Sequence, residues 1–500
     1  MLGTIQNMLI LGLGGFVGLL VTLAFLAPSV FMHNKLAVSL WGKFESKAEV
    51  RKFAFLAIIF CFIIGIYWAL RPLKDGIFSD YLVFKQWQPM AKLLSLVLIV
   101  PLIIFYNKLI DTFSRNKLFY VLTIGYASVA VFFAFLFYSE TFGIGAAPAY
   151  VRPEGSWLIT AFIKSFWGRP VIGWFWYVFV ESFGSLLVAL FWAFTSDITK
   201  PGAAKRGFPM IALLGQMGNI LGPKFVTAER FGFATSSPVV LILAMLILCV
   251  GGLLWLFVTV TPKEQLTGFE AAEVEARAHE KEMKEHKEEP GFLDGLKHLL
   301  KHKYLLGIAG IIIFYEVIVT LFDYVFKVMA KEQYTGEAGM SGFLAMYGVW
   351  TGIVATICVL FGINNIQRKL GMKVSLIVMP LLVLVALLTL KFYSYLSVAF
   401  IIMVFAKAVN YALNQPSLKQ AYIPTTKESK YKAQSWIEMF GGRSSKATGS
   451  AINLVNGVSP AAYALLSLVV PLGLIGLWVF IAIFVGKTYT TAVKENKVVC

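Results

Sequence analysis

The stretch KYKAQSWIEMFGGRSSKATGS, residues 430–450, carries charged side chains where a membrane-spanning helix normally has none. If a helix enters the membrane near Lys432, a rise of about 1.5 Å per residue puts Arg443 and Lys446 roughly 16 to 21 Å along its axis, near the bilayer midplane. These two residues are three positions apart and share a helix face. Each cation would cost about 3 kcal/mol or more against lipid, so both should face a wet cavity or an anionic partner. We favour anion binding over the alternative, a structural ion pair with Glu438 one turn earlier.

The composition around this stretch is that of a polytopic membrane protein. Of the 500 residues, 58% are hydrophobic and 14% are charged, and the mean hydropathy is +0.75, so the chain is more apolar than a soluble core requires. The net charge of +17 would suit nucleic-acid binding, but much of the Lys and Arg flanks apolar segments, as anchoring in the cytoplasm requires. We therefore expect no nucleic-acid partner. The four cysteines have no spacing that indicates a disulfide framework or a metal site.

The apolar segments predict twelve membrane-spanning helices in two sets of six. The first set is expected near residues 53–75, 90–110, 117–138, 168–195, 207–226 and 236–260. The second set is expected near residues 304–326, 341–363, 370–391, 393–413, 434–456 and 461–486. A charged segment between them cannot enter a bilayer and is predicted to be a cytoplasmic helical linker. The predicted parts are an extra N-terminal helix with an amphipathic linker (1–52), the first half (53–261), the charged linker (262–303), the second half (304–487) and a cytoplasmic tail (488–500).

The first apolar run, residues 8–31, is predicted to be a retained extra helix. No basic residue precedes it and LAPSV is a poor cleavage site, so a signal peptide is disfavoured. No Arg- and Ser-rich transit peptide is present either, which indicates the inner membrane of a bacterium. With the charged linker in the cytoplasm, Lys and Arg are more frequent in the short loops on that side than outside. Both ends of the twelve-helix core are therefore expected in the cytoplasm.

The two sets of helices resemble each other as repeats. The pattern R-x3-MIxxLG from Arg206 resembles K-x3-WIxxFG from Lys432, and residues 69–75 can be paired with residues 320–326. Repeats of this kind place a substrate cavity between two halves that rock in alternating access. The sequence therefore predicts an all-α, major-facilitator-like bundle of six plus six helices with pseudo-two-fold halves and one extra N-terminal apolar helix.

Charged and amide side chains inside the predicted spans are the candidate functional residues. Besides Arg443 and Lys446, those near mid-membrane are Glu181, Gln216, Asn219, Glu316 and Lys407. Internal pairing, for example of Glu181 with Lys407, is the alternative to a functional role. Four more lie nearer the outer ends of the first and seventh spans, where snorkelling to the interface is the alternative: Arg71, Lys74, Asp323 and Lys327.

The predicted cavity would combine cations, a few carboxylates and aromatic helices such as WGRPVIGWFWYVFVE. Arg and Lys match phosphate oxygens, and aromatic rings stack on a planar base, so a phosphorylated solute with a ring is favoured. The glycines Gly215, Gly218 and Gly222 either pack two helices closely or leave room for such a ring; close packing is the favoured alternative. No Walker A sequence is present, so primary pumping is not supported. We expect transport without bond breaking, and no enzyme activity.

Four stretches resemble the bacterial and plastid nucleotide transporters, the non-mitochondrial ATP/ADP translocases. LRPLKD (70–75) is similar to the family's LRDTKD, and LFDYVFK (321–327) is similar to LTEVVWK. The segment YVFVESFGSLLVALFWAFTSDITKPGAAKRGFP (177–209) is similar to the family's fourth helix. YALNQPSLKQAYIP (411–424), followed by residues 430–449, is similar to YALFDPTKEMAYIP and the K-x-KGKAAID-x-VGSRLGKSGG that follows it. Together these stretches and the twelve-span plan cover residues 50 to 490.

The resemblance implies ATP/ADP antiport and assigns roles to the candidates. Lys74 would be the family's functional lysine, Glu181 its glutamate, and Asp323 a replacement for a second glutamate. The expected phosphate-binding residues are Arg71, Lys74, Lys327, Lys432, Arg443 and Lys446. The expected gating or coupling residues are Glu181, Glu316, Asp323 and Lys407, and the expected base-binding residues are Gln216 and Asn219. We expect a monomer in the bilayer with a nucleotide substrate and no cofactor, metal or catalytic residue.

Several positions depart from the family pattern. Asp323 is shorter than the glutamate it replaces, Leu418 and Lys419 stand where the family has Lys-Glu, and Gln434 replaces a lysine. Two other functions therefore stay open. The chain could be a proton-coupled net importer of nucleotides or of another organic phosphate, or a non-transport membrane protein on the same fold.

Overall fold

The computed structural model describes residues 2–113, 115–199, 201–266, 297, 299–360, 364–422, 424–425, 437, 441–495 and 497–499. Within these residues the chain forms helices and no β-strand. Ten of the described helices are long and apolar enough to cross a membrane by length and composition. Lys432 and Glu438, and most of the charged linker, lie outside the described residues. The expected all-α polytopic class is confirmed.

The chain begins with three helices that precede the first half. They are α1 (Leu2–Leu26), α2 (Pro28–His33) and α3 (Lys35–Trp41). Helix α1 packs beside α4 (Lys47–Tyr81) and α9 (Pro201–Phe225). The Lys224 amine donates to Gln6 Oε1 at 3.2 Å and so ties α9 to α1.

Six long helices form the first half. Besides α4 and α9 these are α5 (Phe84–Thr112), α6 (Arg115–Phe137), α8 (Pro170–Asp197) and α11 (Ser237–Val260), with the short helices α7 (Leu158–Lys164), α10 (Ala228–Phe231) and α12 (Lys263–Leu266) between or after them. Helix α4 starts at a defined cap, because the Ser46 hydroxyl accepts from the Glu49 amide. Helix α5 starts six residues before the expected residue 90, so the polar sequence FKQWQ is helical rather than part of a loop.

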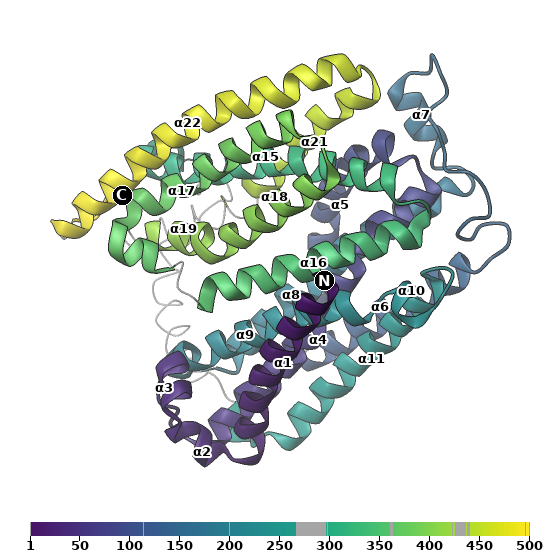
Figure 1. Cartoon of the computed structure of the whole chain (residues 1–500). Coiled ribbons are helices and arrows are strands. Elements are labelled where there is room, and N and C mark those ends of the chain that lie inside the picture. Colours follow the sequence, from purple (N-terminus) through teal and green to yellow (C-terminus); the bar gives the residue numbers. More distant parts are fainter. Residues whose placement is uncertain are drawn as a thin grey trace, which may run out of the picture.

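The second half repeats this plan and lies beside the first (Figure 1). Its helices are α15 (Lys303–Gln333), α16 (Gly336–Leu360), α17 (Asn364–Phe392), α18 (Leu396–Val409), α19 (Gln415–Ala421), α21 (Gly442–Leu454) and α22 (Pro460–Lys494). A π-helical turn, η1 (Asn410–Asn414), joins α18 to α19, and a 3-10 turn, η4 (Val455–Gly457), follows α21.

Glycines bring α4 and α9 into backbone contact. A Cβ added to Gly218 would lie 2.2 Å from the Cys61 carbonyl oxygen, and one added to Gly222 would lie 2.0 Å from that of Gly65. No side chain fits in either place, so these two glycines serve close helix packing. A Cβ on Gly215 would lie 2.6 Å from the Phe60 ring. The alternative that this flank leaves room for a planar ligand is therefore wrong at Gly218 and Gly222.

The two halves contact each other along two pairs of surfaces. Helix α16 packs on α4 and α9, and α21 packs on α5. The contact is tight where α4 ends and α16 begins, since a Cβ on Gly76 would lie 1.9 Å from Ser341 Oγ. On the same side the Tyr324 hydroxyl donates to the Lys85 carbonyl oxygen at 2.6 Å. We call this side, marked by Gly76, Lys85, Tyr324 and Ser341, the closed end.

Candidate functional site

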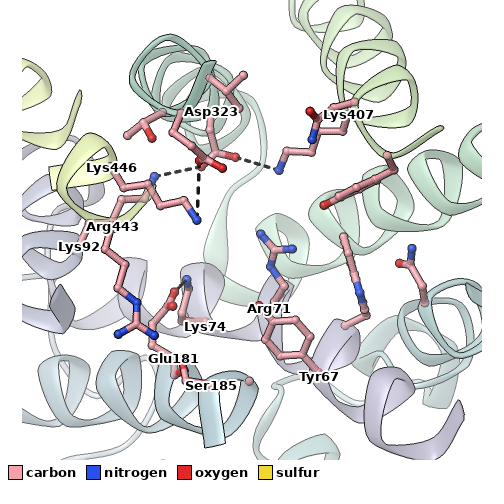
Figure 2. A pocket seen from close by; sticks show the side chains of 18 of the residues that line it. Tyr67, Arg71, Lys74, Lys92, Glu181, Ser185, Asp323, Lys407, Arg443 and Lys446 are labelled. Atoms are coloured by element: carbon pink, nitrogen blue, oxygen red, sulfur yellow. Dashed lines mark hydrogen bonds and ion pairs between the residues drawn. The ribbon is translucent and has the colours of Figure 1, made fainter. Parts of the chain in front are cut away.

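A cavity of about 680 Å³ lies between the two halves and is lined by α4, α5, α8, α9, α15, α18, η1, α19 and α21. Its charged lining consists of seven cations and three carboxylates, an excess of four positive charges: Arg71, Lys74, Lys92, Lys327, Lys407, Arg443 and Lys446, with Glu181, Glu316 and Asp323. Figure 2 shows Asp323 and Lys407 on one side of this space and Lys74 with Glu181 on the other. Cations in such excess favour an anionic occupant.

Asp323 on α15 is the centre of the most buried group. Its carboxylate accepts from Lys327 at 2.8 Å, one turn along the same helix, and from Lys92 of α5 at 3.1 Å. Lys407 of α18 lies 3.8 Å away on the other carboxylate oxygen. Lys327 also lies 2.9 Å from Asp75 of α4. We call these five residues the Asp323 cluster.

Helix α4 supplies a second charged group on the opposite wall. Lys74 is buried and pairs with Glu181 of α8, and its amine lies 4.3 Å from the centroid of the Tyr177 ring. One turn earlier, the Arg71 guanidinium lies 4.6 Å from the centroid of the Trp68 ring. The ring orients this guanidinium by a cation–π contact.

Helix α21 presents the third group, Arg443 and Lys446. Lys446 lies 3.7 Å from Glu316 of α15, and its side chain is 59% exposed although it lines the cavity. The helix is held on α15 by Gly449, where a Cβ would lie 2.9 Å from Thr320 Cβ, and by Asn453. The Asn453 amide donates to the Thr320 carbonyl oxygen at 3.3 Å. These contacts hold the backbone of α21 against α15, while more than half of the Lys446 side-chain surface stays exposed in the cavity.

Amide side chains line the part of the wall formed by α9. Gln216 and Asn219 both face the cavity, and the Asn219 amide donates to Gln216 Oε1 at 3.5 Å. Asn219 Oδ1 is buried and has no hydrogen-bond partner among the described residues. This acceptor is therefore left unsatisfied within the described residues.

The π-helical turn η1 forms part of the cavity wall contributed by the second half. Lys407, Asn410, Tyr411 and Gln415 line the cavity from α18, η1 and the start of α19. The Asn414 amide donates to Asn410 Oδ1 at 2.8 Å across the turn. Single π-helical turns inside α-helices are frequent at functional sites, because they re-aim the side chains around them.

Eleven of the twelve residues expected in the site line this cavity. They are Arg71, Lys74, Glu181, Gln216, Asn219, Glu316, Asp323, Lys327, Lys407, Arg443 and Lys446, whereas Lys432 lies outside the described residues. Their individual roles stay predictions. Glu181 is internally paired, as the alternative for it stated, but its partner is Lys74 and not the example given, Lys407. Snorkelling is wrong for Lys74, Asp323 and Lys327, because these three residues are buried.

Sequence reasoning missed Lys92 and Asp75. The hydropathy pattern starts the second span near residue 90, which puts Lys92 at a helix end and makes it look like an anchor. In the structure α5 starts at Phe84, so Lys92 lies about 12 Å into the helix at 1.5 Å per residue. The preceding polar sequence FKQWQ, read as helix, would have indicated this depth.

Known proteins are similar in sequence to this chain over nearly its whole length. A model of the TLC ATP/ADP transporter family matches residues 30–489. ADP,ATP carrier protein 1 of Rickettsia prowazekii (strain Madrid E) is 26% identical over 90% of this chain and 95% of its own. ADP,ATP carrier protein 3 of Rickettsia bellii (strain RML369-C) is 23% identical over 94% of this chain and its entire own length.

A solved structure shows the same fold. A bacterial homologue of the human lysosomal transporter Spinster, solved in an inward-facing and unoccupied conformation, matches 89% of this chain and 98% of its own with a TM-score of 0.53 and 13% identity. That likeness shows the fold alone, and it agrees with the expected major-facilitator-like arrangement. The family match covers most of the chain, while identity to the carriers is only about a quarter. The chain is therefore a divergent member of the TLC ATP/ADP transporter family.

Proposed function

We propose that this chain exchanges ATP for ADP across a bacterial inner membrane by alternating access. The observation that carries the proposal is the cavity between the halves, with four more cations than carboxylates along its wall. Its volume of about 680 Å³ lies in the range typical of small-molecule sites. The carriers to which the chain is similar are named for ADP and ATP.

The phosphates would bind to the cations that line the cavity. Lys446 and Arg443 are accessible within the cavity, so they would meet the phosphates first. Arg71 presents a fork of donors that matches two phosphate oxygens. Lys74 and Lys327 are buried and already paired, so they would bind phosphate by exchanging a carboxylate for it. Lys432 is proposed as a phosphate ligand from the family resemblance only.

The base would lie against α4 and α9. Trp68 and Tyr67 line the cavity beside Arg71 and supply rings on which a base can stack. Gln216 and Asn219 supply amides that can bond to the polar edge of a base, and the unpaired Asn219 Oδ1 suits an amino group.

The carboxylates would hold the cations while no nucleotide is bound. Glu181 pairs with Lys74, Glu316 with Lys446, and Asp323 with the lysines around it. Binding of phosphate would replace these pairs, which makes Glu181, Glu316, Asp323 and Lys407 the proposed gating residues. Because ATP carries about one negative charge more than ADP, exchange would respond to the membrane potential unless an ion compensates. We further propose a monomer with both ends of the twelve-helix core in the cytoplasm.

Uptake of labelled ATP into proteoliposomes tests this proposal. We expect rapid uptake when the vesicles contain ADP and little uptake when they are empty. Equal uptake into empty vesicles under a proton gradient, abolished by a protonophore, would contradict exchange. It would assign net import instead, with Glu181 and Glu316 as the first candidates for the proton site.

A further inference from the structure

Lys92 is a cavity cation that joins the two halves. It lies on α5 of the first half and donates to Asp323 on α15 of the second half at 3.1 Å. Its side chain is 19% exposed, against 9% for Lys327 and 12% for Lys407, the other two lysines around Asp323. A ligand in the cavity can therefore reach Lys92 more easily than its two neighbours.

A second ion pair joins the two halves, and in this pair the lysine comes from the second half and the aspartate from the first. Lys327 of the second half lies 2.9 Å from Asp75 of the first half, so that each half contributes one lysine and one aspartate. Asp75 lines a small adjoining pocket and not the main cavity, and its side chain is 4% exposed. Lys327 lines the main cavity but Asp75 does not, so the Lys327–Asp75 pair is less open to the cavity than the Lys92–Asp323 pair, of which both members line it.

Both pairs lie near the closed end. Beyond them the halves are held by the Tyr324 hydroxyl on the Lys85 carbonyl, and by Glu337 of α16, which accepts from the Ser236 amide and hydroxyl at 2.6 Å each. Alternating access requires the halves to separate at this end. The ion pairs that cross the halves must break when that happens.

We propose that Lys92 is a gate residue as well as a phosphate ligand. This rests on the proposed function for its substrate, a nucleoside di- or triphosphate. Asp323 is shared by three lysines, so a phosphate that enters the cavity binds Lys92 before Lys327, at a stage when Lys327 and Lys407 still neutralise the carboxylate. The loss of the Lys92–Asp323 pair removes the bridge that substrate can reach and leaves Lys327–Asp75 to break afterwards. Bound substrate thereby lowers the barrier to opening of the closed end.

The rate of disulfide cross-linking at the closed end reports how often the two halves are in contact there. A Cβ on Gly457 would lie 3.8 Å from Gln86 Cα, so Gln86→Cys with Gly457→Cys places one thiol on each half. The full-length chain would carry this pair after Cys61, Cys249, Cys358 and Cys500 are replaced by Ser. The rate of disulfide formation under a mild oxidant is measured with and without ADP. Every variant is first checked for a single monodisperse peak in size-exclusion chromatography.

In the parent we expect fast cross-linking that ADP slows. Lys92→Gln should slow cross-linking roughly tenfold without ADP, which corresponds to about 1.4 kcal/mol, and should remove the effect of ADP. Lys92→Arg should restore both properties, since it keeps the charge. Lys117→Gln is the control, because Lys117 is an exposed lysine of the first half that does not line the cavity, and it should behave as the parent. Asp75→Asn should also slow cross-linking but keep the ADP effect.

If Lys92→Gln cross-links as fast as the parent without ADP, the proposal that Lys92 holds the closed end shut is wrong. If ADP slows cross-linking in Lys92→Gln as much as in the parent, the proposal that substrate opens this end through Lys92 is wrong. If Lys92→Gln does not stay monodisperse, Asp75→Asn tests the proposal instead. We propose that substrate acts on the Lys92–Asp323 pair and not on the Lys327–Asp75 pair, so loss of the ADP effect in Asp75→Asn would contradict it. A thermal shift with ADP in the unmodified chain tests the proposed function separately. Absence of that shift would contradict nucleotide transport, while the comparison without ADP would still decide the gate.

Discussion

The Asp323 cluster and the cations of α21 are two ways of holding positive charge inside one membrane protein. In the cluster, three lysines are tied to Asp323, and the Lys327 and Asp323 side chains are only 9% and 11% exposed. On α21, Lys446 is 59% exposed and its carboxylate partner Glu316 lies 3.7 Å away. Lysine side chains are therefore buried and ion-paired in the Asp323 cluster, whereas on α21 Lys446 is largely exposed.

This difference separates two functions of a charged residue. A tied lysine is already neutralised, so losing its partner leaves a buried charge that the fold must accommodate. A solvated lysine contributes little to stability, because water screens its ion pair, but it can meet an incoming phosphate. We therefore expect mutations in the cluster to act on folding and gating, and mutations on α21 to act on affinity.

The largest effect should come from Asp323→Asn. This change leaves Lys92, Lys327 and Lys407 with Asp75 as the nearby acid and should lower the free energy of unfolding by about 3 kcal/mol or more. Transport should be lost with it. The thermal midpoint of the purified chain, beside ATP uptake, measures both, and Asp323→Glu is the control that keeps the charge. A midpoint equal to that of the unmodified chain would show that the cluster is not a stabilising unit.

Neutralising Lys446 should have an intermediate effect, on the apparent KM for ATP and not on stability. Lys446→Gln should raise the apparent KM for ATP about tenfold, as expected for the loss of one hydrogen bond to a charged group. The thermal midpoint should stay unchanged. Lys487→Gln, an exposed lysine on α22, is the control and should alter neither quantity. A loss of folded protein in Lys446→Gln as large as the loss of uptake would instead favour a structural ion pair with Glu316.

The smallest effect should come from salt. Raising KCl from ~50 to ~300 mM should increase the apparent KM roughly two- to threefold, because screening acts on exposed charges more than on buried ones. The thermal midpoint should change little over the same range. In Lys446→Gln the salt dependence of KM should be weaker than in the unmodified chain. An equal dependence in both would mean that the buried cations dominate the initial attraction of nucleotide.

Much of the fold could be predicted because apolar length and charge determine it. The helix-length apolar runs and the charged linker were enough to predict a bundle of two related sets of helices. The cations of α21 could be found because a charge deep in an apolar segment needs a partner. Helix starts were less certain: the polar residues before Met90 look like a loop by hydropathy, although in the structure they begin α5.

The pairing within the site could not be predicted, since it depends on how helices face one another. Nothing local to Glu181 says that it meets Lys74 rather than Lys407. The sequence gives no sign that Asp75, next to Lys74, has a partner of its own, whereas in the structure it pairs with Lys327. These pairs join residues more than a hundred positions apart or on different halves, and only the packing of α4, α8 and α15 decides them.

The π-helical turn at Asn410–Asn414 makes the site depend on the length of the chain as well as on its side chains. Such a turn holds one residue more than an α-helical turn. Deleting one residue there would turn it into an ordinary α-helical turn and would leave the helix on either side in nearly the same orientation. Lys407 before the turn and Gln415 after it would still face the cavity, while the side chains within the turn, among them Asn410 and Tyr411, would change direction. A deletion elsewhere in this helix would instead rotate every later residue by about 100°, so we expect the turn to be the place where the helix best accepts a change in length.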